Sequence, residues 1–148
     1  MQRFFSWQCG GQGLADRSMK SKSIIQTDAA PPAVGPYSQA TAYGELLFTA
    51  GQIPLDPVTG ELIQGDIKAQ TLRVLSNLKA VLEAGGSGLT NVLKTTVFLT
   101  DLAHFSQMNT VYADFFNESL PARSTIQVSA LPKGALVEIE AIAYKNPS

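Results

Sequence analysis

The segment LPARSTIQVSALPKGALVEIEAIAY, residues 120–144, decides the fold because it contains two β-patterned runs separated by a turn. The first run, residues 124–128, is rich in β-branched side chains, which favour an extended backbone. Pro132 and Gly134 mark the turn. In the second run, residues 136–144, side chains alternate between two faces of a strand, and one face carries only Val137, Ile139, Ala141 and Ala143. The segment therefore predicts a hairpin-like unit of two strands.

Three charged residues of this segment are candidates for chemistry. Arg123 precedes the first run, while Glu138 and Glu140 share one face of the second, about 7 Å apart along the strand. A guanidinium binds a carboxylate through two parallel hydrogen bonds, and a nearby carboxylate can orient or deprotonate water. The set would suit hydrolysis of a small organic acid. From spacing alone, solvated or salt-bridged side chains are the more frequent alternative.

Upstream of this segment, the pattern predicts two helices and further strands. Asp66 is placed to cap a helix whose apolar residues recur at helical spacing until Gly85 and Gly86 end it. Residues 91–100 are β-branched and apolar, as in a buried central strand. Asp101 begins a second helix, whose predicted core stripe is Leu102, Phe105, Met108, Tyr112, Phe115 and Phe116. Shorter strands are expected at residues 23–27, 40–43 and 45–51.

This order of elements predicts an α+β fold, a mixed sheet with both helices on one face. Both faces of the last strand carry apolar residues, so we expect other subunits to cover the second face of the sheet. Residues 19–148 are expected to form a single domain. Residues 1–18 have no regular periodicity and are expected to be a flexible N-terminal extension.

Composition narrows the classes of function. Hydrophobic residues make up 45% and charged residues 16%, the net charge is −1, and no block of Lys and Arg is present, so nucleic acid is an unlikely partner. One cysteine and one histidine make a disulfide within the chain impossible and a metal site unlikely. No apolar run approaches the roughly 18 residues of a membrane span. We expect a cytoplasmic protein, or a mitochondrial one if residues 1–18 act as a targeting segment.

Four motifs, taken in order, resemble one known family. They are Gly35-Pro36-Tyr37-Ser38-Gln39, Thr49-Ala50-Gly51-Gln52-Ile53-Pro54, Pro121-Ala122-Arg123-Ser124 and the strand from Val137 to Ala143. The combination closely resembles the RidA proteins, the reactive intermediate/imine deaminases of the YjgF family, over residues 22–145. Each motif alone would be weak, but their joint order is specific.

The resemblance implies a chorismate-mutase-like subunit assembled as a homotrimer, with sites in the clefts between subunits. It also implies hydrolysis of 2-iminobutanoate and 2-iminopropanoate to 2-oxo acids and ammonia without a cofactor. Arg123 matches the arginine that clamps the substrate carboxylate, and Glu138 matches the acid that positions the water. Tyr37 matches the tyrosine lining the pocket, and Gly51 the backbone contact near the substrate. Glu140 is expected to play a supporting or interfacial role.

Two further positions complete the predicted site. Asn109 falls where the family often has a pocket asparagine, and Thr125 stands where many members have a cysteine. A hydroxyl keeps hydrogen bonding but lacks thiol reactivity, so thiol-dependent behaviour is not expected here. Two alternatives stay open: a single-strand ribonuclease or translation inhibitor, as family members have been described, and a small-acid-binding or chaperone-like protein without turnover.

Overall fold

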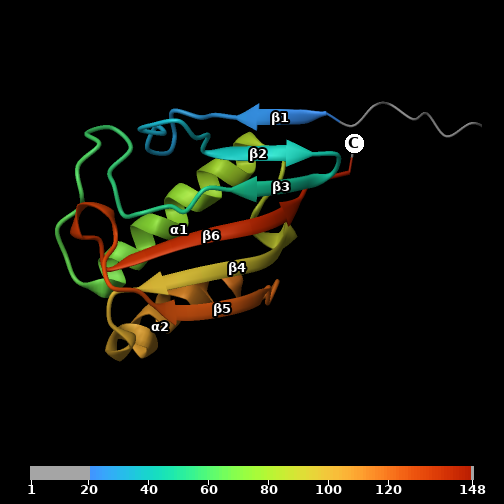
Figure 1. Cartoon of the computed structure of the whole chain (residues 1–148). Helices are drawn as coiled ribbons and strands as arrows, with labels where there is room; N and C mark the ends of the chain where they lie inside the picture. Colours follow the sequence, from blue (N-terminus) through green and yellow to red (C-terminus); the bar gives the residue numbers. More distant parts are fainter. Residues whose placement is uncertain (1–20, 148) are drawn as a thin grey trace, which may run out of the picture.

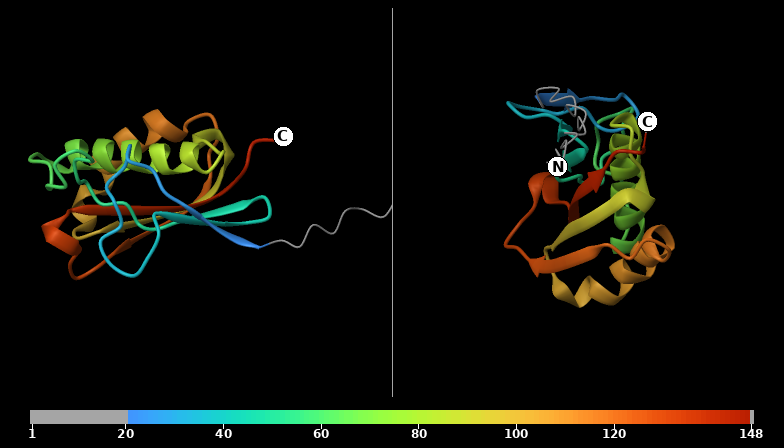
Figure 2. Two further views of the ribbon diagram at one scale, coloured as in Figure 1. Left: turned by 90° about the horizontal axis from the view of Figure 1, so that it is seen from above. Right: turned by 90° about the vertical axis from the view of Figure 1, so that its right-hand side faces the viewer.

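The computed structural model describes residues 21–147, so the predicted extension at residues 1–18 lies outside the described part. Within this described part, one six-stranded mixed sheet carries two α-helices, both on the same face (Figures 1 and 2), which confirms the predicted α+β class. The strands are β1 (Lys22–Ile25), β2 (Ala40–Tyr43), β3 (Leu46–Thr49), β4 (Val92–Leu99), β5 (Ala122–Gln127) and β6 (Val137–Tyr144). The helices are α1 (Ile67–Ala84) and α2 (Phe105–Phe116).

The strand order is β1-β2-β3-β6-β4-β5, with β4 and β5 parallel and every other pair antiparallel. The predicted hairpin-like unit is therefore wrong, because β4 lies between β5 and β6 (Figure 1). Parallel neighbours need a crossover connection, and α2 supplies it between β4 and β5. After β5 the chain passes the end of β4, and β6 then pairs with the edge of β4 opposite β5.

Helix α1 begins and ends where the sequence predicts. The Asp66 carboxylate accepts a hydrogen bond from the Ala69 N–H at 3.0 Å, which caps one of the free amides of the first turn. At the other end Gly86 has φ +76°, the left-handed conformation that glycine adopts without steric strain. The Ser87 N–H then reaches the Leu82 carbonyl at 2.9 Å and closes the helix.

The core lies between the helices and the covered face of the sheet. Its largest fully buried side chains include Leu47, Ile67, Leu75, Leu78, Leu82, Leu99, Met108, Phe116 and Ile139. The stripe predicted for the second helix is wrong at its start, because Leu102 is 45% and Phe105 37% exposed. Leu102 belongs to a short 3₁₀ turn, Leu102–His104, that precedes α2. Phe105 instead lies against an arginine side chain.

No helix formed by residues 21–147 covers the other face of the sheet, as Figure 2 shows. Alternation along β6 buries Val137, Ile139, Ala141 and Ala143 beneath the helices and turns the intervening residues outward. Leu46, Phe48 and Tyr144 are exposed side by side on adjacent strands. We call this uncovered surface the open face. Among residues 21–147, no helix has the length and hydropathy of a membrane span.

Candidate functional site

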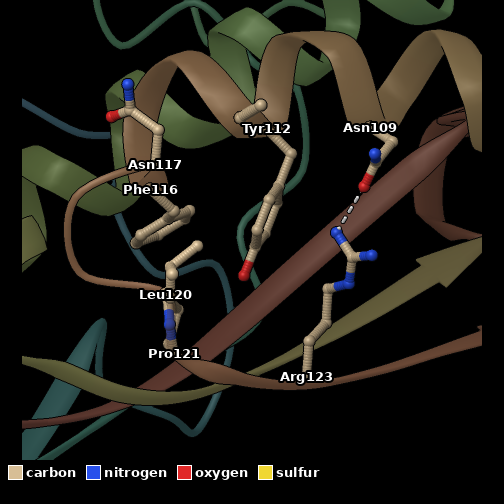
Figure 3. A pocket seen from close by; sticks show the side chains of 8 residues that line it. Asn109, Tyr112, Phe116, Asn117, Leu120, Pro121 and Arg123 are labelled. Atoms are coloured by element: carbon tan, nitrogen blue, oxygen red, sulfur yellow. Dashed lines mark hydrogen bonds between the residues drawn. The ribbon is translucent and has the colours of Figure 1, made fainter.

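Arg123 lies on β5, beneath α2 (Figure 3). Its register partner on β4 is Thr95, which is fully buried on the helix side, so the Arg123 side chain points to the same side. There Nη1 donates a hydrogen bond of 2.8 Å to the Asn109 side-chain oxygen. The guanidinium carbon lies 4.6 Å from the ring centre of Tyr112 and 5.4 Å from that of Phe105. Side chains from successive turns of α2 thus hold the cation by aromatic and polar contacts.

Tyr112 is itself held in place. Its hydroxyl lies 2.7 Å from the Thr95 hydroxyl in the interior. Burial raises the pKa of Tyr112, and the Thr95 hydrogen bond and the Arg123 charge oppose this only in part. The ring therefore stays neutral at physiological pH. Helical spacing alone indicated only a core position for Tyr112, although its place three residues after Asn109 puts both on the same helix surface.

Arg123 has no carboxylate partner in the part of the chain that the structure describes. Within residues 21–147 the ion pair found joins Lys79 and Glu83 on the surface of α1, at 3.9 Å. A half-buried cation without an anion is electrostatically unsatisfied, so a carboxylate brought by a ligand gains from binding here. The guanidinium nitrogens other than Nη1 are available for the two parallel hydrogen bonds that a carboxylate accepts.

Thr125 lies two residues further along β5, on the same face as Arg123, because its register partner is the buried Val97. Its hydroxyl oxygen is buried and has no hydrogen-bond partner among the described residues. A buried hydroxyl without a partner is unfavourable in an empty site, and it can donate to or accept from a bound ligand. The role of Thr125 in binding substrate stays a prediction.

Glu138 lies on the open face of the sheet, since its register partner on β4 is the partly exposed Phe98. The adjoining segment is fixed by Gln52 and Ile139, which exchange backbone hydrogen bonds of 2.9 and 3.1 Å. This pairing presses Gly51 against the Glu138 carboxylate, where any Cβ at position 51 would overlap it. A larger residue at position 51 would therefore force the Glu138 side chain to move.

The electrostatic environment of Glu138 favours its protonated form. Burial raises the pKa of the Glu138 carboxyl, and repulsion from the neighbouring Glu140 raises it further. A carboxylate whose pKa is raised is a stronger base, which favours a role in accepting a proton from water. Glu138, the acid predicted to position the water, combines this raised pKa with the contact to Gly51.

Tyr37 ends the loop between β1 and β2 and is 55% exposed. Its hydroxyl accepts a hydrogen bond from the Val34 N–H at 3.3 Å. Together with Gly51 it lines a pocket of about 350 Å³. The loop is shaped by Gln39, a buried residue whose role the sequence did not reveal: its side chain donates to the carbonyls of Thr27, Ala30 and Pro31 and accepts from the Thr27 N–H.

The predicted residues form two clusters on opposite faces of the sheet. Arg123, Asn109 and Thr125 lie on the helix side, whereas Glu138 lies on the open side with Gly51 and, at the nearby loop, Tyr37. Arg123 and the two acids of one chain therefore do not face one another. The cause is register: Arg123 aligns with Thr95, and Glu138 aligns with Phe98, an odd number of residues away along β4.

The described residues hold no gathered set of three His, Cys, Asp or Glu side chains that could bind a metal ion. The chemistry that the two clusters offer is that of a carboxylate-binding cation and a proton-exchanging acid.

A family model described as endoribonuclease L-PSP matches residues 27–145. The chain belongs to this family. It is the YjgF family that the four motifs predicted. The chain is 58% identical over 125 residues to a RutC family protein of Pyrococcus horikoshii, covering 84% of this chain and 99% of that protein. It is 45% identical over 126 residues to the 2-iminobutanoate/2-iminopropanoate deaminase of Bos taurus, covering 85% and 92%.

Solved structures of the family have the same fold. A crystal structure of E. coli TdcF with bound serine superposes with a TM-score of 0.79, at 46% identity, and covers 84% of this chain and 99% of that one.

Proposed function

We propose that this protein hydrolyses reactive 2-imino acids to 2-oxo acids and ammonia. The observation that carries the proposal is Arg123, a half-buried cation held by Asn109 and two aromatic rings, with no carboxylate partner among residues 21–147. A mammalian relative bears the name of this deaminase, and a structural relative binds serine, a small molecule with a carboxylate and a nitrogen on the adjacent carbon. Both relatives support a ligand of this chemistry.

In the proposed reaction Arg123 binds the substrate carboxylate through two hydrogen bonds and orients the adjacent C=N carbon. Glu138 accepts a proton from water as the water oxygen adds to that carbon, and the proton is returned to the nitrogen. The hydroxyl proton of the resulting carbinolamine is then transferred to its nitrogen, and ammonia leaves as the C–N bond breaks and the C=O bond forms. Tyr37 and the backbone of Gly51 line the pocket, and Thr125 offers a hydroxyl to the bound acid.

The proposal includes a homotrimer with sites between subunits. Because Arg123 and Glu138 point to opposite faces of one sheet, a complete site needs the Arg123 side of one copy and the open face of another. The apolar side chains exposed on the open face supply the driving force for such an assembly. Three copies are what the family resemblance implies.

The test is a coupled assay in which a threonine dehydratase generates 2-iminobutanoate and the appearance of 2-oxobutanoate is timed. Arg123→Ala should lower kcat/KM by about 30-fold or more, the equivalent of roughly 2–5 kcal/mol for a truncated charged pair. Arg123→Lys keeps the charge but not the planar fork and should fall in between. The matched control is Arg73→Ala on α1. Full acceleration by Arg123→Ala would overturn the assignment.

The ribonuclease activity that the family name carries fits this chain less well. Its net charge of −1 provides little of the electrostatic attraction on which single-strand binding depends. Binding to a single-stranded RNA at low salt, followed by cleavage, would favour that alternative. A protein that binds 2-oxobutanoate but leaves the lifetime of the imine unchanged would be a binding protein.

A further inference from the structure

The segment 51–55 forms one wall of the pocket of about 350 Å³ that also contains Tyr37, and one buried side chain of α1, Asn77, holds this wall. We propose that Asn77 is a positioning residue of the site, which keeps the segment 51–55 against Glu138 and thereby controls the surroundings of that acid. The inference rests on the proposed function. It adds to the site a residue of α1, the helix on the opposite face of the sheet from Glu138.

Asn77 is 1% exposed and makes two contacts with the segment. Its side-chain nitrogen donates hydrogen bonds to the Leu55 carbonyl at 2.9 Å and to the Ile53 carbonyl at 3.3 Å. Two carbonyls that face one amide can be satisfied only by its NH2 end, which has two donors, so the orientation of the side chain is fixed. An apolar residue at position 77 would remove both donors and release the segment from α1.

The other end of the same amide indicates that Asn77 does more than stabilise the fold. Its side-chain oxygen is buried and has no hydrogen-bond partner among residues 21–147. The cost of burying an unsatisfied acceptor is comparable to what the hydrogen bonds of the nitrogen return, so the net gain in stability is small. A buried polar group with this balance needs another explanation, and the explanation offered here is the position of the segment.

A short path connects this position to Glu138. Gln52 exchanges backbone hydrogen bonds of 2.9 and 3.1 Å with Ile139, the residue after Glu138. The segment is thus attached to β6 near its start and to α1 near its end. Gly51 lies against the Glu138 carboxylate, where a Cβ at position 51 would overlap it. Because the approach is so close, a small movement of the segment changes how much solvent reaches the carboxylate.

A second buried amide on α1 holds another wall of the same pocket. Gln70, which is 4% exposed, precedes Asn77 by seven residues, or about two helical turns, so both lie on the same face of the helix. Its side-chain oxygen accepts a hydrogen bond from the Leu136 N–H at 2.8 Å. Leu136 follows the turn whose Pro132 and Lys133 line the pocket. One rigid helix therefore fixes two loops of the site, as a preorganised site requires.

The expected consequence concerns the basicity of Glu138. Burial is the first cause of its raised pKa, and the segment that begins at Gly51 contributes to this burial. In an Asn77→Leu protein the segment moves, water reaches the carboxylate, and the pKa of Glu138 falls toward its ordinary value. A weaker base accepts a proton from water less readily, so kcat decreases. The contacts of Arg123 with the substrate carboxylate are unchanged, so KM is not.

The experiment measures the pH profile of kcat for 2-iminobutanoate with the assembled, full-length protein, after subtraction of uncatalysed hydrolysis. Asn77→Leu should lower kcat by about fivefold or more, part of what a general base contributes, and should keep KM within about twofold of the wild-type value. The acidic limb of the profile should move to lower pH, because a base with a lower pKa stays deprotonated further into acid. Asn77→Ser, which keeps one donor on a shorter side chain, should change both quantities in the same direction by less.

The matched control is Val92→Ala. Val92 is buried at the far end of β4 from Phe98, the register partner of Glu138, so the cavity left by this substitution lowers Tm away from the site. Its pH profile should be that of the wild-type protein. The other titratable groups of this strand and pocket, which are Glu140, Tyr37 and Lys133, are the same in all variants. A loss of Tm in Asn77→Leu with a wild-type pH profile would show that Asn77 is only structural, and the proposed function would stand.

A titration that needs no turnover separates the two proposals. Carbon NMR of protein labelled at the glutamate carboxyl carbons, with the Glu138 signal assigned through Glu138→Gln, gives the titration midpoint of Glu138 directly. The midpoint should lie at lower pH in Asn77→Leu, and in the milder Asn77→Ser, than in the wild-type protein and Val92→Ala. If the wild-type protein does not accelerate imine hydrolysis, the proposed function is wrong and this titration alone decides whether Asn77 controls the acid. Equal midpoints in all four proteins would overturn the role of Asn77.

Discussion

At the scale of the residue, Glu138 is a carboxyl whose folded environment opposes its charge. Burial comes first among the causes that raise its pKa, and the charge of Glu140 comes second. Between the ordinary value of 4.5 and the raised value in the fold, the folded state binds more protons at Glu138 than the unfolded state does. The free energy of unfolding must then decrease as pH rises through this window and level off above it.

Glu138→Gln should therefore raise Tm at pH 8 and change it little at pH 4, because glutamine keeps the shape but carries no charge. The comparison is made in an Arg123→Ala background, which removes the cation that a neighbouring copy would bring to Glu138. Thermal unfolding at the two pH values gives the result, with Glu61→Gln as an exposed control. An equal effect of Glu138→Gln on Tm at pH 4 and pH 8 would contradict the electrostatic cause. In the wild-type background, which keeps Arg123, Glu138→Gln should abolish imine hydrolysis.

At the scale of the element, prediction succeeded where the signals are local. Asp66, the helical spacing that follows it and Gly85 lie within one continuous segment, and α1 has the predicted bounds. The pairing of β5 and β6 failed because partner choice depends on β4, which lies more than twenty residues upstream of β5. Local pattern favours a hairpin between strands that follow one another, whereas the crossover through α2 places β5 parallel to β4.

The same distinction applies to the candidate site. Residue type and strand pattern, and then the motif resemblance, identified Arg123 and Glu138 as candidates. No local pattern states which face of the sheet each side chain takes, since a shift of one residue in register reverses it. Tyr112 was assigned only to the core because its hydroxyl partner, Thr95, lies on another element. Gln39 was missed for a similar reason: an isolated polar residue in a sequence does not reveal that it will be buried among carbonyls.

The loop that carries Tyr37 depends on Gln39, and this dependence is testable. Gln39→Ala removes four hydrogen bonds and leaves buried carbonyls without a donor, which should lower the free energy of unfolding by about 1–3 kcal/mol. Urea unfolding measures the loss, and Gln26→Ala on the exposed surface beside β1 is the matched control. If the loop positions Tyr37 for substrate, KM should rise as well. If the free energies of unfolding of Gln39→Ala and Gln26→Ala differ by less than about 0.3 kcal/mol, the loop holds its shape without Gln39. Differences of this size are within the usual scatter between independent substitutions.

At the scale of the whole molecule, the sheet has one face covered by helices and one open face that exposes apolar side chains. Leu46, Phe48 and Tyr144 are each about two-fifths exposed on it, at 39%, 42% and 39%. Ile142 lies beside Phe48 in register and adds to the same surface. Glu138 and Glu140 project from this face too, so covering it with another copy would both bury hydrocarbon and enclose the acid. Under the proposed function, catalysis therefore depends on assembly.

Phe48→Lys should therefore disrupt assembly and activity together. A charge in the middle of the open face would have to be desolvated without a partner when copies associate, and this opposes the burial that drives association. Sedimentation should detect a shift from the assembled species to the monomer, and imine hydrolysis should fall by at least tenfold at the same protein concentration. Leu72→Lys is the matched control, because Leu72 is 51% exposed on α1, which faces away from the open surface. Far-ultraviolet circular dichroism should be unchanged in both variants, since the two side chains are exposed in the single chain. An assembled and fully active Phe48→Lys protein would show that the open face is not the surface through which copies meet, and Arg123 and Glu138 would then need another route to a common site.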